Sequence, residues 1–254
     1  MHLVHLESQK VPAKDRTRQV FLATLSLHAV FIAFKYFIPL NADIFSLSGY
    51  THLAAFLILF VSFCIEQRTA ARFFMLFTIP MGLLFWFLAV LVETHGQIET
   101  LARPPIWLWT HLGLLLGGLV ALILAFCSAL MYLLQSWQLK SKHVGSVFMK
   151  LPSLDVLDQL HFRALSLGVI FFSLGILSGF LWAKQTREIG GLIQDPKVLL
   201  SFLTCLMYWM VLGFRLSRVR RGKKIAAGTA LVFVLLLVTI LSSYYAPTLY
   251  HRGF

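Results

Sequence analysis

Two histidines, His111 and His251, are the residues of this chain best suited to chemistry. His111 lies five residues after the start of a long apolar segment, and His251 lies seven residues beyond the end of the last one. Neutral imidazole is a common metal ligand, and two imidazoles on one side of a membrane can bind a single iron. We therefore predict a two-histidine iron site, provided that the apolar segments bring both residues to the same face.

The composition identifies a membrane protein. The chain of 254 residues is 59% hydrophobic and 13% charged, whereas soluble domains average about 25% charged residues. Several apolar runs reach 18 residues or more, which is enough to cross the bilayer as a helix. The formal net charge of +12 then reflects basic loops on the inner face rather than nucleic-acid binding. The basic N-terminal tail lacks the apolar core of a signal peptide, so we expect the first span to direct insertion.

We predict an all-α fold, a polytopic bundle that forms one integral membrane domain over residues 1–254. Seven spans are expected, near 20–38, 47–65, 73–92, 106–134, 161–183, 198–214 and 225–244. The run at 106–134 is longer than the bilayer requires, so we expect it to tilt or to extend beyond the membrane.

The distribution of basic residues predicts the orientation. Sixteen of the 22 lysines and arginines fall in the N-terminal tail and in alternate connections between spans, if Arg163, just inside the fifth span, is included. Cytoplasmic loops are enriched in these residues, so the N-terminus is predicted inside and the C-terminus outside. His111, His251 and the connection between the fifth and sixth spans then share the outer face. The six basic residues of the outer side are Lys35, Arg103, Lys184, Arg187, Lys197 and Arg252.

Three further residues near this predicted site have a functional and a plainer interpretation. Trp107 and Trp109 precede His111 and could line a ligand, but tryptophans at the membrane interface also form an ordinary aromatic belt. His28, within the first span, is either a hydrogen-bonded structural histidine or a second iron ligand.

Other kinds of chemistry find little support in the sequence. Asp155 and Asp158 share a helical face, but we expect them to pair with Arg163 rather than to act as an acid–base couple. The three cysteines are single and lie in apolar runs, which excludes a Cys-x-x-Cys site. No phosphate-binding loop or hydrolase motif occurs, and carboxylates are nearly absent from the spans, which disfavours pumps and proton-coupled transporters.

Several segments resemble the CcsA/CcmC/HemX superfamily of cytochrome c assembly proteins, in particular its short HemX-type members. The resemblance rests on the sequence LPSLDVLD at 151–158 followed by Arg163, and on the run SLGILSGFLWA at 173–183. It also rests on Asp195-Pro196-Lys197 before the sixth span and on the Thr110-His111 span. It is strongest from about residue 104 to 251.

The resemblance implies a protein that handles heme during the maturation of c-type cytochromes in a bacterial inner membrane. It implies heme ligation by His111 and His251, with His28 as a further ligand, and a heme-proximal place for Trp107, Trp109 and Asp195. Because basic residues are few on the outer side, Arg103, Lys184 and Arg187 are either partners for the heme propionates or interfacial anchors. A ResB-type membrane partner and apocytochrome c are implied as well, and the role is that of an assembly factor rather than an enzyme.

The chain departs from the family at the outer loop 184–195, which reads KQTREIGGLIQD and lacks the family's tryptophans. Seven rather than eight spans are also expected. Two alternatives therefore stay open beside heme handling. One is a HemX-like membrane regulator or scaffold for heme-pathway proteins that binds no heme. The other is a small-molecule transporter, which the lack of buried charge disfavours.

Overall fold

The computed structural model describes residues 12–37, 46–69, 73–93, 106–141, 152–185, 195–217 and 222–245, and these form only helices. The helices are α1 (Pro12–Ile32), which continues as the π-helical turn η1 (Ala33–Phe37), α2 (Leu47–Arg68), α3 (Phe74–Glu93), α4 (Ile106–Ser141), α5 (Leu154–Gln185), α7 (Pro196–Leu216) and α8 (Lys223–Tyr245). Seven of them are long and apolar enough to cross a membrane. The predicted all-helical fold with seven candidate spans is thus confirmed.

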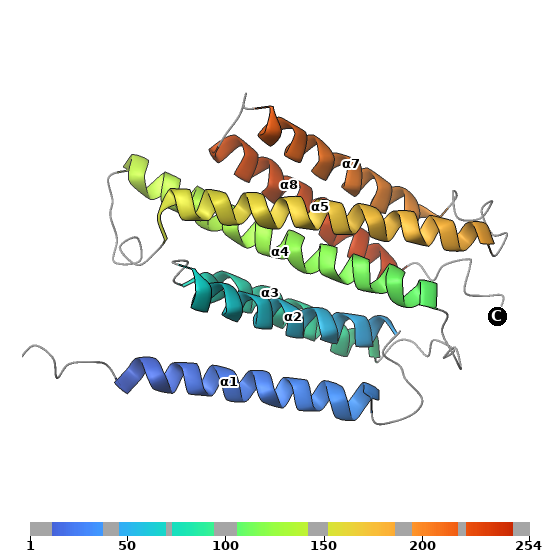
Figure 1. Cartoon of the computed structure of the whole chain (residues 1–254), viewed down its shortest axis with the longest axis horizontal. Helices are drawn as coiled ribbons and strands as arrows, with labels where there is room; N and C mark the ends of the chain where they lie inside the picture. The colour runs from blue at the N-terminus through green and yellow to red at the C-terminus, as the bar shows by residue number, and fades with distance from the viewer. Residues whose placement is uncertain are drawn as a thin grey trace, which may run out of the picture.

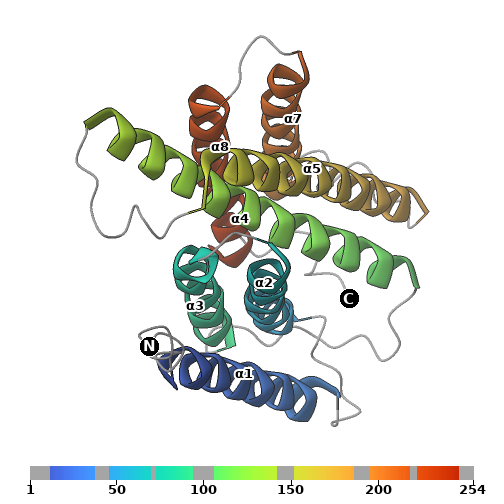
Figure 2. The ribbon, with the colours of Figure 1, turned by 60° about the vertical axis from the view of Figure 1, so that its left-hand side comes forward.

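The helices are arranged in layers, with successive helices running in opposite directions (Figure 1). The antiparallel pair α4 and α5 occupies the middle, α7 and α8 lie on one side, and α2 and α3 lie on the other. Helix α1 is outermost, as a second view also shows (Figure 2). Burial agrees with this order, because 67% of the α4 span is buried but only 11% of the α1 span. We call the end of the bundle where α4 begins and α5 ends the His111 end.

Close approach between α4 and α5 depends on glycine. A Cβ atom at Gly118 of α4 would lie 2.7 Å from the backbone nitrogen of Phe172 in α5. Because this neighbour is backbone, a side chain could be accommodated only if the helices moved apart. Small residues at such points let membrane helices gain van der Waals contact along their length. The pair α4–α5 is therefore the scaffold on which His111 is placed.

Several helices extend beyond their predicted bounds. Helix α4 has 36 residues, which at 1.5 Å per residue is about 54 Å and longer than the roughly 30 Å hydrocarbon core. Helix α5 begins at Leu154, directly after Pro152 and Ser153, and the Ser153 hydroxyl accepts a hydrogen bond from the Val156 amide at 3.4 Å. Hydrophobicity identifies only the part of a helix that lies inside the bilayer. The predicted span, which begins near residue 161, therefore starts later than the helix itself.

Candidate functional site

The side chain of His111 docks onto the backbone of α5 at the His111 end. Its Nδ1 lies 2.8 Å from the carbonyl oxygen of Gly175. A carbonyl only accepts hydrogen bonds, so Nδ1 is the donor, and in a neutral imidazole the lone pair is then on Nε2. Metal-binding histidines typically donate their other ring nitrogen to a carbonyl or carboxylate in this manner. His111 is thus held in the tautomer that ligates through Nε2.

Two further residues of α5 surround the same imidazole. The Ser178 hydroxyl donates to the Gly175 carbonyl at 2.7 Å and lies 3.4 Å from His111 Nδ1. Gly179 packs directly against the ring, since a Cβ atom there would lie 2.5 Å from Cε1 of His111. The sequence run at 173–183 therefore supplies the surface on which His111 rests.

The two tryptophans before His111 lie in the first turn of α4, and the side chains of Trp107 and Trp109 are each 46% exposed. This exposure at a helix end suits an aromatic belt, and their contact with a ligand stays a prediction. Asp195 has a structural role as the N-cap of α7, where its carboxylate accepts the Lys197 amide hydrogen bond at 2.9 Å. This capping role is enough to explain an aspartate at position 195, and its contact with a cofactor stays a prediction.

His28 belongs to a second polar cluster, between α1 and α2. Its ring meets that of His52 edge-on, with 6.5 Å between the centroids, and meets Phe56 at 5.8 Å. Nε2 of His28 is buried and has no hydrogen-bond partner among the described residues. His52 is fixed through Nδ1, which lies 2.8 Å from the Tyr36 hydroxyl. This cluster is in the half of the bundle nearer the His111 end, because α2 begins there.

Part of the predicted site lies outside the described residues. This applies to His251, Arg103 and Arg187, and to the side chain of Lys184. Whether His251 meets His111, and whether basic groups surround them, therefore stays a prediction. Within the described part of the chain, no three His, Cys, Asp or Glu side chains gather as a metal site.

The predicted pairing of Asp158 with Arg163 is wrong. The carboxylate of Asp158 instead forms a salt bridge with Arg215 near the end of α7, and the guanidinium of Arg215 also lies over the ring of Phe162. Arg163 is exposed. Helical spacing identified a neighbour on the same helix, whereas the observed partner comes from another helix, a contact that sequence spacing cannot indicate.

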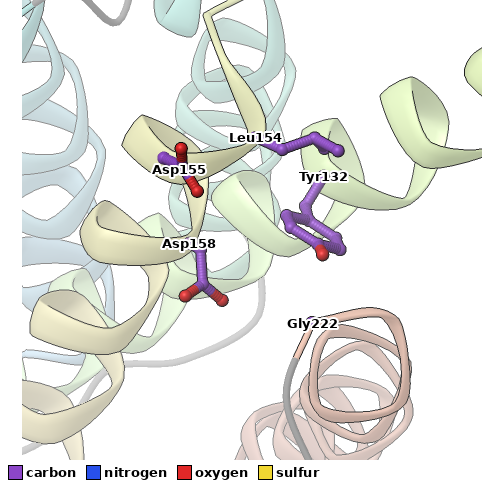
Figure 3. Close-up of a pocket in the computed structure, with 5 residues that line it drawn as sticks. All are labelled: Tyr132, Leu154, Asp155, Asp158 and Gly222. Atoms are coloured by element: carbon purple, nitrogen blue, oxygen red, sulfur yellow. The ribbon is translucent and has the colours of Figure 1, made fainter.

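A small pocket of about 210 Å³ lies beside this ion pair, away from the His111 end (Figure 3). The pocket is lined by Tyr132, Leu154, Asp155, Asp158 and Gly222. The hydroxyl of Tyr132 points toward Gly222, which precedes α8 and has a φ of +69°. A side chain at Gly222 would collide with this hydroxyl, so glycine is required here for both its conformation and its size.

We expect Gly222→Ala to destabilise the protein by about 1–2 kcal/mol, because alanine is strained at positive φ. Adding Tyr132→Phe to this variant should restore only the part of the lost stability that is due to the clash with the Tyr132 hydroxyl. Thermal unfolding in detergent measures both effects. Gly228→Ala, within the helix α8 that follows, is the control, since its Cβ would meet Val211 at an ordinary 3.5 Å. Equal stability of the variants at 222 and 228 would show that the turn is not as described.

Sequence reasoning missed two groups of residues at these sites. It gave His52 no role, although Ser48 and His52 are one helical turn apart and their side chains interact at 3.5 Å, a spacing that could have suggested a shared cluster. It also gave Gly175, Ser178 and Gly179 no physical role. Their contact with His111 joins residues more than 60 positions apart and required the α4–α5 packing to be known.

Comparison with known proteins gives a consistent family. The model of the family described as Cytochrome C assembly protein matches residues 44–251. Protein HemX of Brevibacillus brevis is 35% identical over 136 residues, which is 53% of this chain and 49% of that protein. Protein HemX of Bacillus subtilis (strain 168) is 22% identical over 215 residues, 84% of this chain and 78% of that protein.

The cytochrome c biogenesis protein CcsA of Synechococcus sp. (strain CC9902) is 28% identical over 168 residues, 58% of this chain and 54% of that protein. Two of these three alignments thus span only about half the length of the relative. No solved structure matches the chain.

The family match begins just before α2 and extends to His251, so it includes the α4–α5 scaffold and both histidines of the predicted pair. It covers well over half of the 254 residues. The chain therefore belongs to the cytochrome c assembly protein family.

Proposed function

We propose that this protein is a cytochrome c assembly factor that binds or relays heme, with His111 as one axial ligand. The observation that carries the proposal is the hydrogen bond from His111 Nδ1 to the Gly175 carbonyl at 2.8 Å. It leaves Nε2 as the nitrogen with a lone pair, the form in which histidine binds iron, and it holds the ring against α5. Heme iron is commonly held by such a histidine, and the bound group supplies the redox-active iron.

His251 is proposed as the second axial ligand, because the predicted orientation brings it to the face where α4 begins. Arg103, Lys184 and Arg187 would supply positive charge for the heme propionates on that face. The name of the CcsA relatives, cytochrome c biogenesis protein, supports a role in that pathway. A ResB-type membrane partner and apocytochrome c complete the proposal, with the inner membrane of a bacterium as its location.

The proposal requires the His111 end to face outward, and labelling can test this. Ile106 and Lys140 lie at opposite ends of α4, and both are exposed. In a chain whose native cysteines are replaced, we expect a membrane-impermeant maleimide to label Ile106→Cys in intact spheroplasts. Lys140→Cys should react only after permeabilisation. The reverse pattern would place His111 inside and refute the outer-face site.

His28 is proposed as a ligand at a second position for heme within the membrane. The buried Nε2 without a partner supports it, since an unsatisfied polar atom at that depth is costly unless a ligand uses it. We expect hemin titration of the ligand-free protein to show two binding phases, of which His28→Ala removes one. Ser26→Ala, an exposed position on the same helix, serves as the control. An unchanged titration would mean that His28 is structural.

The proposed function is tested by purification in mild detergent from heme-replete cells, followed by absorption spectroscopy. A Soret band in the unsubstituted protein, strongly reduced in the double variant His111→Ala, His251→Ala, is the expected result. Colourless protein with native stability would instead favour the scaffold function, in which the bundle organises heme-pathway proteins without binding heme.

A further inference from the structure

Three residues in the segment 173–182 of α5 meet one imidazole, that of His111. Gly175 contributes its carbonyl oxygen, Ser178 its hydroxyl and Gly179 its bare backbone. Glycine-containing runs normally serve only close helix packing. Here the side chain that enters the space left open by glycine is His111, the proposed iron ligand.

The carbonyl oxygen of Gly175, which lies within the helical ladder of α5, also accepts two side-chain hydrogen bonds. His111 Nδ1 donates at 2.8 Å and the Ser178 hydroxyl at 2.7 Å. The two side-chain donors share one acceptor oxygen with the helical amide bond, so the strength of each bond depends on the others. Ser178 Oγ is also 3.4 Å from Nδ1, which places the hydroxyl beside the ring proton. The hydroxyl thus influences how strongly the imidazole is polarised.

Gly179 determines whether this arrangement can form at all. A Cβ atom there would lie 2.5 Å from Cε1, 2.8 Å from Nδ1 and 3.3 Å from Nε2 of His111. The ring therefore lies across the α-carbon of Gly179, and any side chain would push it away. A displaced ring loses the Gly175 carbonyl, and its proton can then move to Nε2, which leaves the lone pair on Nδ1 instead of on the nitrogen proposed to bind iron.

We propose that Gly179 and Ser178 are positioning residues, which hold His111 with Nδ1 protonated and Nε2 ready to bind iron. The consequence for heme rests on the proposed function, whereas the orientation of the ring is a property of the protein without heme. Outer partners of metal-binding histidines are typically worth about 10–100-fold in affinity. Gly179→Ala should therefore weaken hemin binding by at least ~10-fold.

Nitrogen-15 NMR of ring-labelled, ligand-free protein tests the positioning directly, with His111→Gln identifying the relevant signals. In the unsubstituted protein we expect Nδ1 protonated and Nε2 bare. Gly179→Ala should produce a protonated Nε2 at His111. Gly113→Ala is the matched control, because nothing lies within 4 Å of a Cβ at that position, and it should leave the signals unchanged. A folded Gly179→Ala protein with the unsubstituted His111 signals would overturn the proposal.

Ser178→Ala keeps the size of the helix surface and tests the second positioning residue, also if Gly179→Ala fails to fold. In Ser178→Ala we expect the Nδ1 signal of His111 to shift while Nε2 stays unprotonated. Ser178→Thr retains a hydroxyl and should restore the original Nδ1 signal. Identical His111 signals in Ser178→Ala would contradict the role of Ser178. Hemin titration of the same samples separates the two proposals. If Gly179→Ala moves the His111 signal but the unsubstituted protein binds no hemin, the positioning holds and the heme function fails.

Discussion

Replacing His111 with glycine is expected to remove heme binding at the His111 end, and added imidazole is expected to restore it. The substitution deletes one axial ligand and leaves a space of the shape of the lost ring between α4 and α5. Free imidazole can fill that space and supply the same nitrogen. We expect the affinity for hemin to fall by about 100-fold or more, since loss of a ligand should exceed the 10–100-fold typical of its supporting groups.

The measurement is a hemin titration followed by absorption spectroscopy, with and without imidazole at millimolar concentration. His5→Gly, a change in the N-terminal tail, controls for the loss of a histidine as such. Gly179→Ala in the His111→Gly chain gives a sharper test, because its methyl group occupies the same space. Imidazole should then rescue poorly. Undiminished hemin affinity in His111→Gly would exclude His111 as a ligand.

The second large effect concerns the scaffold, where Gly118→Ala should destabilise the protein by about 2–3 kcal/mol. Overpacking a tight core typically costs about 1–3 kcal/mol, and this site is at the upper end because the neighbour is the backbone of Phe172. Separating α4 from α5 also lengthens the His111–Gly175 hydrogen bond two helical turns away. We therefore expect lower thermal stability together with weaker hemin binding.

The buried thiol of Cys127, which has no exposed surface, reports this unfolding. A thiol-reactive fluorescent dye should label it at a lower temperature in Gly118→Ala, in a chain where Cys64 and Cys205 are alanine. Gly113→Ala lies on the same helix in open space. There alanine should be neutral or stabilising by up to ~1 kcal/mol, because it is the better helix former. Similar labelling temperatures for both variants would contradict the close α4–α5 packing.

The helical fold could be predicted from the sequence because membrane spans depend on local properties. Twenty apolar residues form a helix in a bilayer whatever lies elsewhere in the chain. The helix ends were harder, since α4 and α5 continue past the hydrocarbon core. The partner of Asp158 could not be predicted, because Arg215 belongs to another helix and lies 57 positions away in the sequence.

His111 could be singled out from the sequence as a candidate ligand, but its surroundings could not be predicted. His111 is recognisable because ionisable side chains are rare in spans, and its neighbours in sequence are tryptophans and glycines. The groups that give it a defined tautomer belong to α5 and become neighbours only when Gly118 and its counterparts let the two helices touch. His28 was likewise recognisable alone, whereas its contact with His52 depends on how α1 lies against α2.

We propose that His111 and His251 bind the same iron. Electron paramagnetic resonance of the ferric, hemin-loaded protein in detergent tests it most directly, preferably in a His28→Ala chain so that only one site is observed. Two imidazole ligands predict a low-spin ferric signal. Either single change, His111→Ala or His251→Ala, should convert it to a high-spin signal. A high-spin signal in the parent chain, or a low-spin signal that survives both single changes, would contradict the account.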